Sequence, residues 1–340
     1  MSKKPHTVLI TGGAGYVGAV LVPKLIKKGY KVKVIDLYLF GDNLWPELDH
    51  HSNLEQHKGD IRDQVLLREI LPDCDSVVHL ACISNDPSFE LDPELGKSIN
   101  FDAFEPLVRI SKESGVRRFI YASSSSVYGV SKVPNVDEDH PLVPLTDYSK
   151  FKSLCEPILL DQQSKDFIPF ILRPATVCGY SPRQRMDLSV NILTNHAVNN
   201  GRITVFGGKQ MRPNINIQDM TDLYLMLLEL PELKISGKIY NAGYQNHTVM
   251  ELAMMAQKVV EADYFEGKKK IEIVTTPTDD VRSYHISSEK IKKDLGFIPK
   301  FTVEDAIREL VNAFKAGKLP NSMTDPRYFN IKTMQQLQLT

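Results

Sequence analysis

Tyr148 and Lys152 are the pair of side chains in this sequence best suited to proton transfer. They stand four positions apart, so on a helix both side chains lie on one face, about one turn from each other. An ammonium group beside a phenol favours the phenolate and lowers the pKa of the tyrosine toward neutral pH. The pair therefore predicts a general acid or base that exchanges a proton with a substrate hydroxyl group.

Ser124 stands 24 positions before Tyr148, within a run of four serines at 123–126 that follows the strand-like segment 118–122. A serine hydroxyl at the end of a strand can hold the same substrate oxygen as the tyrosine and share its proton. A tyrosine and a lysine at this spacing occur on many amphipathic helices. Their interpretation therefore depends on the elements that precede them in the chain.

An apolar run, a glycine turn and a helical pattern open the chain. Residues 7–10 are followed by Gly12, Gly15 and Gly18 and then by apolar residues at helical spacing. Gly12 allows a tight turn, Gly15 lets the backbone approach a pyrophosphate, and Gly18 lets the helix pack close to the sheet. The helix dipole would then face the phosphates. This order predicts dinucleotide binding, with a purely structural turn as the alternative.

A second apolar run, 31–35, ends in Asp36, which lies 18 residues after Gly18. A carboxylate at this place can accept hydrogen bonds from the adenosine ribose and repels a 2′-phosphate. The predicted cofactor is therefore NAD rather than NADP. Its positive nicotinamide ring, near Tyr148, would act with the ammonium of Lys152 to lower the pKa of the tyrosine.

Strand-like and helix-like runs alternate through the first half of the chain, which indicates a parallel sheet with helices on both faces. We predict an α/β fold in which residues 1–175 form a Rossmann-like, doubly wound parallel sheet. Residues 176–317 would form a smaller α/β lobe over the carboxyl edge of the sheet, and 318–340 a surface strap or a partly ordered end. Helices are expected at 93–114, 187–200, 219–230, 248–262 and 303–316.

The composition excludes several other classes of protein. The 41 Lys and Arg residues balance 42 Asp and Glu residues, which gives no support for nucleic acid or a membrane surface as a partner. The four cysteines and nine histidines show no metal-ligand spacing, so reduced thiols and no metal are expected. An apolar signal segment and a run long enough to cross a membrane are both absent, and we expect a cytoplasmic protein.

With these motifs, residues 6 to about 316 resemble the extended short-chain dehydrogenase/reductase family, and within it the nucleotide-sugar epimerases and dehydratases. The resemblance rests on the glycine turn and on Asp60, Ile61, Arg62, Asp63, His79, Leu80, Ala81, Asn100, Ser124, Tyr148, Lys152, Arg173, Pro174 and Gly179. It implies an NAD-dependent enzyme that acts on a nucleoside-diphosphate sugar, with Ser124, Tyr148 and Lys152 as the catalytic residues.

The resemblance also assigns binding roles. The implied cofactor residues are Gly12, Gly15, Tyr16, Val17, Gly18, Asp36, Asp60, Ile61, Leu80, Ala81, Asn100, Tyr148 and Lys152. The implied substrate residues are Ser84, Ser124, Ser125, Asn191, Arg212 and Arg282. Asp60 has a second interpretation as the N-cap of the next helix. Arg183 and Arg185 are either diphosphate ligands, whose guanidinium groups match phosphate oxygens, or structural surface residues.

The two residues after Ser124 bear on the reaction. Members of this family that eliminate water typically carry Asp and Glu there, whereas this chain has Ser125 and Ser126. We therefore predict a 4-epimerase that works through a transient 4-keto sugar. The block around Arg183 also resembles GDP-heptose C4 dehydrogenases, so a C4 dehydrogenase or 4-keto reductase is the main alternative. A 4,6-dehydratase and a regulator without turnover are less favoured.

The resemblance further implies a homodimer. In the family, two helices of each subunit pair across a two-fold axis, and here they would be 100–114 and 151–160. Both segments carry apolar residues. These residues could equally pack inside one subunit.

Overall fold

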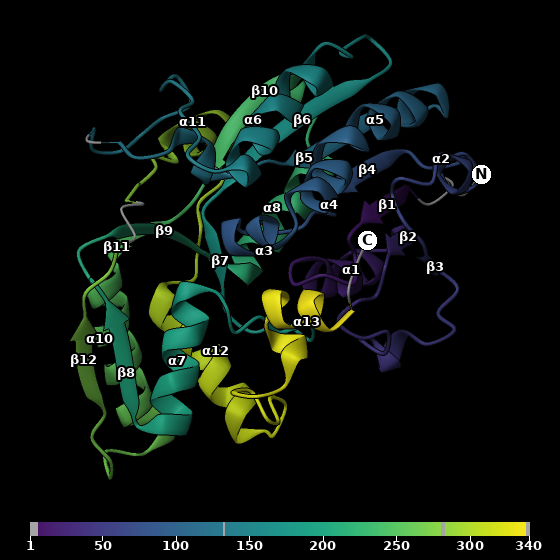
Figure 1. Cartoon of the computed structure of the whole chain (residues 1–340). Helices are drawn as coiled ribbons and strands as arrows, with labels where there is room; N and C mark the ends of the chain where they lie inside the picture. Colours follow the sequence, from purple (N-terminus) through teal and green to yellow (C-terminus); the bar gives the residue numbers. More distant parts are fainter. Residues whose placement is uncertain (1–5, 132, 280–282, 338–340) are drawn as a thin grey trace.

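The computed structural model describes residues 6–131, 133–279 and 283–337 and shows two lobes with the C-terminal segment between them (Figure 1). The larger lobe is built on seven parallel strands. In spatial order they are β3 (Leu54–Lys58), β2 (Lys31–Asp36), β1 (Thr7–Thr11), β4 (Ser76–His79), β5 (Arg118–Ala122), β6 (Ile168–Pro174) and β10 (Lys238–Ala242). The strand order reverses between β1 and β4, as in a doubly wound Rossmann-like sheet. The predicted fold class is confirmed.

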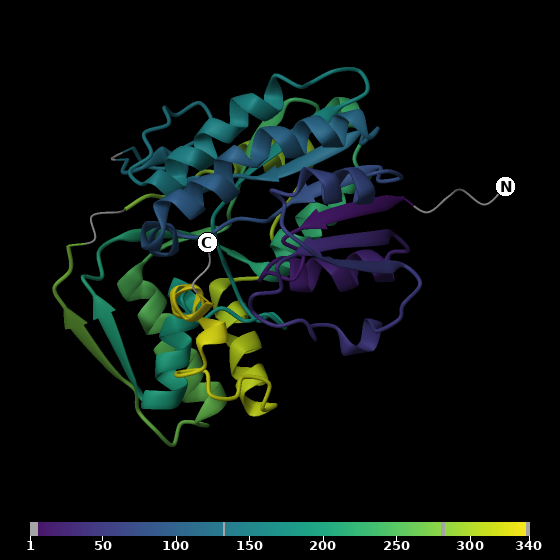
Figure 2. The ribbon, with the colours of Figure 1, turned by 45° about the vertical axis from the view of Figure 1, so that its right-hand side comes forward.

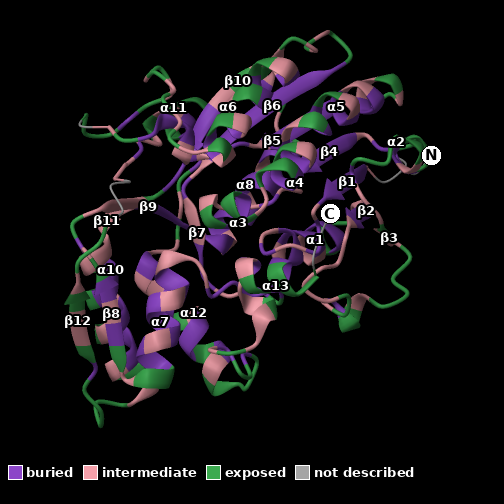
Figure 3. Ribbon diagram, viewed as in Figure 1, coloured by how far each residue is buried: buried purple, intermediate pink, exposed green. Residues whose placement is uncertain are grey.

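Helices cover both faces of this sheet (Figure 2). In β1, Val8 and Ile10 are buried on one face and Leu9 on the other. The first face carries α1 (Gly18–Lys27), α8 (Ile217–Glu229) and α11 (Glu289–Leu295), and the second carries α2 (Gln64–Ile70), α5 (Phe104–Glu113) and α6 (Asp147–Leu160). Burial from both sides explains why the central strands read as continuous apolar runs (Figure 3).

The smaller lobe packs three helices against two small sheets. One sheet has the order β11 (Gln245–Thr248), β9 (Met211–Asn216), β7 (Thr176–Cys178), and the other pairs β8 (Arg202–Phe206) with β12 (Glu272–Thr276). The helices are α7 (Ser189–Asn200), α10 (Val249–Val259) and α12 (Val303–Lys315). They agree with the helices predicted at 187–200, 248–262 and 303–316.

The chain crosses between the lobes more often than one boundary after residue 175 allows. Helix α8 agrees with the helix predicted at 219–230, but it packs on α1 in the larger lobe. After the short α9 (Glu232–Ile235), β10 joins the seven-stranded sheet beside β6. The larger lobe therefore takes its last strand from the range predicted to be mainly the substrate lobe.

The segment 93–114, predicted as one helical stretch, is interrupted. A π-helical turn at Ser98–Asp102 separates α4 (Pro93–Lys97) from α5. Within this turn, the side-chain amide of Asn100 accepts a hydrogen bond from the N–H of Ile83 at 2.8 Å and donates one to its carbonyl at 3.0 Å. The interruption places Asn100 where it braces the loop after β4.

The described part of the tail, 318–337, is more deeply embedded than the predicted surface strap. Its helix α13 (Asn330–Leu337) packs against α3 (Asp86–Leu91), and both Asn330 and Met334 are buried. Figure 1 shows α13 in yellow between the two lobes. The C-terminal segment therefore reaches the edge of the sheet where open α/β folds bind ligands.

Candidate active site

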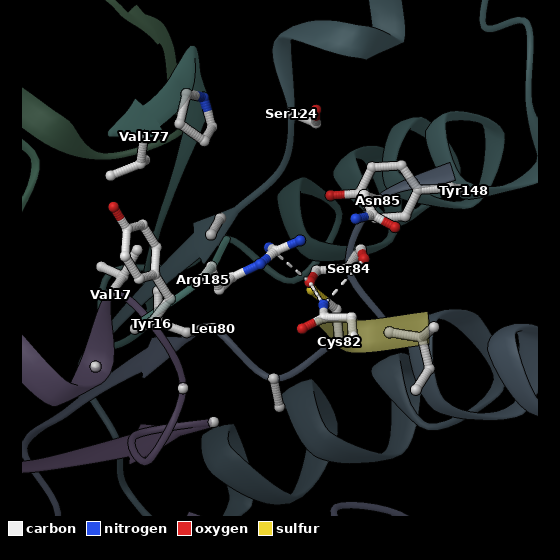
Figure 4. A pocket seen from close by; sticks show the side chains of 18 of the residues that line it. Tyr16, Val17, Leu80, Cys82, Ser84, Asn85, Ser124, Tyr148, Val177 and Arg185 are labelled. Carbon is white, nitrogen blue, oxygen red and sulfur yellow. Dashed lines mark hydrogen bonds between the residues drawn. The ribbon is translucent and has the colours of Figure 1, made fainter. Parts of the chain in front are cut away.

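A cleft with a volume of about 360 Å³ lies at the carboxyl edge of the seven-stranded sheet. The turns that follow β1, β2, β4 and β5 form one side of it, and residues of the smaller lobe and of α13 form the other. The cleft is therefore lined by segments that are far apart in the sequence. Figure 4 shows Arg185 in the middle of the cleft, in a view with Tyr16 on one side and Tyr148 on the other.

The glycine turn lines the cleft with its backbone. Gly12 has a φ of +70°, and a Cβ there would lie 2.6 Å from the backbone of Ala81. A Cβ on Gly18 would overlap the backbone of Gly13. Gly15 lines the same cleft just before α1 begins. The turn thus presents bare backbone and a helix N-terminus, an arrangement that fits the pyrophosphate of a dinucleotide.

Asp36 lies at the end of β2 and also lines the cleft. Its carboxylate accepts hydrogen bonds from the N–H of Ala14 at 2.9 Å and the N–H of Tyr38 at 2.8 Å. Burial raises the pKa of Asp36, while these backbone donors act in the opposite direction. The residue therefore fastens the glycine turn to β2, and its contact with a ribose stays a prediction.

The other predicted cofactor residues divide into two groups. Those that line the cleft are Tyr16, Val17, Asp60, Ile61, Leu80 and Ala81. Asn100 is outside the lining, and both polar atoms of its side chain bond to the backbone of Ile83. The interpretation of Asp60 as a helix N-cap is wrong: the cap of α2 is Asp63, and Asp60 bonds Arg62 at 2.8 Å.

Tyr148 and Lys152 lie in the first half of α6 and both line the cleft. The helix begins at a capping box in which Thr146 and Ser149 exchange hydrogen bonds. Lys152 Nζ donates to the carbonyl oxygen of Ala122 at 2.8 Å and lies 6.0 Å from the centroid of the Tyr148 ring. The lysine is therefore held at the end of β5, beside the tyrosine.

The lowered pKa predicted for Tyr148 depends on the nicotinamide ring of bound NAD as well as on Lys152, and it stays a prediction. Burial raises this pKa well above its usual value, and Asp86 acts in the same direction, whereas Arg185 opposes the shift. Desolvation of the phenolate outweighs the neighbouring cations here. In the chain without a cofactor, the phenol is therefore favoured over the phenolate.

Ser124 and Ser125 lie at the end of β5 and line the cleft. Ser124 caps a short 3₁₀ turn at Ser125–Tyr128: its Oγ accepts from the N–H of Ser126 at 3.1 Å and is 2.8 Å from Ser126 Oγ. The turn keeps the serine hydroxyls together on the same side of the cleft as Lys152 and Tyr148.

A buried ion pair is hydrogen bonded to the residues at the two ends of this serine turn. Arg173 Nη2 lies 2.6 Å from Glu156 Oε2, and both side chains are 4% exposed. Glu156 Oε1 also accepts a hydrogen bond from Ser123 Oγ at 2.7 Å, and Arg173 Nη1 donates to Tyr128 Oη at 2.8 Å. The pair thus ties both ends of the turn to α6 and β6. Glu156 carries no motif, and sequence reasoning missed it.

Only some of the residues predicted to bind the substrate line the cleft. Ser84 lines the cleft, where its Oγ accepts from Arg185 at 3.0 Å. Asn191 is completely buried outside the lining, bonded to Gly179 N–H, Tyr16 Oη and the Arg185 carbonyl. Arg212 lies on β9 and is also outside the lining. Arg282 lies outside the described residues.

Arg183 and Arg185 are buried rather than solvated, at 4% and 8% exposure, and both line the cleft. Arg185 Nε pairs with Asp187 at 2.8 Å. Burial and the charge of Arg185 lower the pKa of Arg183 to about 9, which leaves it protonated at neutral pH. Asp86, which also lines the cleft and accepts from Thr146 at 2.6 Å, was not identified from the sequence.

The doubly wound sheet, the glycine turn and a serine, tyrosine and lysine at one edge define the fold of short-chain dehydrogenases/reductases. The sequence model of the NAD dependent epimerase/dehydratase family matches residues 8–243. The chain therefore belongs to this family, and it is an NAD-dependent enzyme of the extended short-chain type.

Individual relatives agree with this assignment. UDP-glucose 4-epimerase from Lactobacillus helveticus is 28% identical over 322 residues, which cover 88% of this chain and 94% of the relative. UDP-glucose 4-epimerase 2 from Arabidopsis thaliana is 28% identical, with 90% and 94% covered. The crystal structure of UDP-glucose 4-epimerase with UDP-glucose from Thermotoga maritima has a TM-score of 0.80 at 26% identity, covering 92% of this chain and 99% of that one.

Two further findings concern metal ligands and membrane-spanning helices in the described residues. They contain no group of three or more His, Cys, Asp or Glu side chains placed to hold a metal ion. None of their helices has both the length and the apolar character needed to cross a membrane.

Proposed function

We propose that this protein is a nucleotide-sugar 4-epimerase that acts on a nucleoside-diphosphate sugar such as UDP-glucose. The observation that carries the proposal is the serine turn: Ser124, Ser125 and Ser126 line the cleft with Tyr148 and Lys152, and no carboxylate belongs to that turn. The likeness to two UDP-glucose 4-epimerases and to the Thermotoga maritima enzyme supports the same reaction.

The chain's own residues would move one proton. Tyr148 would act as its phenolate, which the ammonium of Lys152 and the positive charge of bound NAD would favour over the phenol. It would take the proton of the sugar O4 hydroxyl while C4 is oxidised, and would return it to O4 after the ketone has turned over. Ser124 would hold the same oxygen through a hydrogen bond, and the ammonium of Lys152 would stabilise the phenolate before it takes the proton and after it has returned it. NAD, when bound, supplies the acceptor and later the donor of the C4 hydride.

A second candidate is elimination of water, and Asp86 is the observation that favours it. Its carboxylate lines the cleft and lies near enough to Tyr148 to raise the pKa of the phenol. An acid or base at this end of the cleft is what abstraction of a C5 proton requires. Asp86 accepts a hydrogen bond from the residue that caps α6, so its position also has a structural explanation, and we rank this function second.

The experiment follows the sugar in D₂O by NMR, with UDP-, GDP-, CDP- and dTDP-sugars as substrates. Epimerisation would interconvert two sugars at C4 with no deuterium at C5 and no net NADH absorbance. Deuterium at C5 with loss of water would overturn the proposal in favour of elimination through Asp86. Stoichiometric NADH would move the function to a C4 dehydrogenase and leave the site residues unchanged.

We also propose a homodimer formed by α5 and α6. Phe104, Leu107 and Val108 are buried within the subunit and are therefore not available for an interface. The face that remains on α6 includes Leu154, which is 41% exposed, and the half-buried Phe151. Light scattering at micromolar concentration tests this, and Leu154→Glu should weaken the dimer because it places a charge in an apolar contact.

A further inference from the structure

Arg183 is a buried cation whose hydrogen-bonding capacity is only partly used. Its guanidinium stacks on Phe40, with Cζ 3.6 Å from the ring centroid, and its Nη2 donates to Asn330 Oδ1 at 2.6 Å. Within the described part of the chain, Nε and Nη1 are buried without a hydrogen-bond partner. Buried donors of a charged group are expensive to leave unpaired, so the site points to a ligand with acceptor oxygens.

The carboxylates nearby are already engaged by other donors. Asp187 accepts from Arg185 Nε through one oxygen and from the Asn330 N–H through the other. Asp36 accepts from two backbone N–H groups. Both carboxylates lie close enough to act on the charge of Arg183, but neither is hydrogen bonded to it. The matching ligand is therefore an anion.

The surroundings of Arg183 indicate which anion this is. Phe40 lies in the segment after β2, and the side chains of Asp36 and Tyr16 act on the Arg183 charge from the glycine-turn side. Arg185, in contrast, acts on Tyr148 at the other end of the cleft. At the glycine-turn end, the pyrophosphate is the anionic part of a dinucleotide, since adenosine and its ribose are neutral.

We propose that Arg183 binds the pyrophosphate of NAD and that Asn330 of α13 holds it in position, so that the C-terminal segment completes the cofactor site. Ser84 extends this support, because its Oγ accepts from Asn330 Nδ2 at 2.8 Å. The pyrophosphate would thus be bound from two sides. Backbone N–H groups of the glycine turn in the larger lobe would donate from one side, and the guanidinium of Arg183 would donate from the other. The inference rests on NAD as the cofactor and not on the reaction at C4.

Binding measurements with three ligands test the proposal. Arg183→Gln should reduce the affinity for ADP-ribose, which contains the pyrophosphate, by about 10- to 100-fold. The affinity for adenosine, which lacks it, should stay as in the wild type. The NAD retained per subunit after gel filtration should fall in parallel. Arg327→Gln, which removes an exposed arginine in the same C-terminal segment, is the matched control and should change none of these values.

Asn330→Ala should give a smaller loss of ADP-ribose affinity, about three- to tenfold, because the guanidinium stays but is less well oriented. Gln335→Ala, at an exposed position of the same helix, should have no effect. Thermal unfolding of both variants is followed by circular dichroism, and binding is measured at a temperature at which both are fully folded. Partial unfolding is then not counted as weaker binding.

Two results would overturn the proposal. If Arg183→Gln keeps its affinity for ADP-ribose and loses affinity for UDP, the arginine binds the phosphates of the nucleotide sugar. If adenosine and ADP-ribose lose affinity equally, Arg183 acts through the fold of the site rather than on the pyrophosphate.

Discussion

The two sides of the cleft are built by different means. On the side of the larger lobe, the glycine turn offers backbone N–H groups, and its side-chain supports come from nearby positions such as Asp36, 22 residues from its partner Ala14. On the opposite side, Arg185 meets Ser84 across 101 positions and Arg183 meets Asn330 across 147. One side is encoded by short stretches of sequence, and the other exists only once the chain has folded.

The difference has an energetic consequence. A glycine turn that lines an open cleft costs little desolvation when no ligand is bound, because water can bond its N–H groups there. Buried guanidinium groups are stable only with partners such as Asp187 and Asn330 in place. On this side, loss of a counter-charge such as Asp187 should therefore destabilise the fold, whereas loss of Arg183 itself should weaken binding.

The largest expected effect separates chemistry from binding on the first side. Tyr148→Phe keeps the ring but removes the hydroxyl that exchanges the proton, so turnover should fall by about 10²–10⁴. NAD content and thermal stability should stay close to those of the wild type. Steady-state rates on the substrate identified by NMR measure this. Wild-type turnover in the variant would remove Tyr148 from the proposed mechanism.

The next largest effect concerns the buried ion pair between Glu156 and Arg173, which holds the serine turn. Glu156→Gln leaves the buried Arg173 without its counter-charge and should lower the free energy of unfolding by about 3–5 kcal/mol. Glu232→Gln is the control, since it breaks the partly exposed pair with Arg117 and should change stability by about 0–1 kcal/mol. Urea unfolding compares them. Equal losses in the two variants would contradict the assigned role of burial.

A smaller effect is expected from pH, through His79 on β4. Burial lowers the pKa of His79 to about 3, against about 6.5 in the unfolded chain. Below pH 6.5 the unfolded chain binds a proton that the native chain does not. The free energy of unfolding should therefore fall as pH decreases, by up to about 1.4 kcal/mol per pH unit until about pH 3.

His79→Gln should remove this contribution and reduce the slope of stability against pH by about one proton. His50→Gln, at an exposed loop residue, is the comparison variant. Urea titrations between pH 7 and pH 4 give the slopes. An unchanged slope in His79→Gln would mean that other groups dominate the acid response.

The smallest effect tests the choice of cofactor. Asp36 should disfavour the 2′-phosphate of NADP by roughly 1–3 kcal/mol, through repulsion and a lost ribose bond. Ala14 and Tyr38 donate to different oxygens of Asp36, so Asp36→Asn keeps an acceptor for only one of them, and thermal stability is measured alongside. The ratio of NADP to NAD dissociation constants, measured by calorimetry, should narrow by about tenfold. Equal affinities in the wild type would exclude the role assigned to Asp36.

Local patterns predicted those features of the site that depend on spacing along one element. Tyr148 and Lys152 lie on one helix, and the serines lie at the end of β5, as their sequence context indicates. Asn100 and Asn191 were assigned to ligands, but both amides are used within the protein. Asparagine side chains serve either purpose equally well, so only the folded environment distinguishes them.

The pKa of Tyr148 likewise depends on the folded environment and cannot be read from spacing alone. The spacing to Lys152 is visible in the sequence, whereas the burial that raises the pKa is a property of the whole cleft. Desolvation depends on every atom that excludes water, and these atoms come from all parts of the chain.

By itself, the sequence determined the doubly wound sheet, through the alternation of strand-like and helix-like runs. It also determined the glycine turn and the serine, tyrosine and lysine of the cleft, because each of these follows from residues within one strand, turn or helix. Only the tertiary structure decided that β10 joins the sheet from the second half of the chain and that α13 brings Asn330 to Arg183. Contacts over more than a hundred positions leave no periodic pattern in a sequence, since they depend on how completed elements pack together.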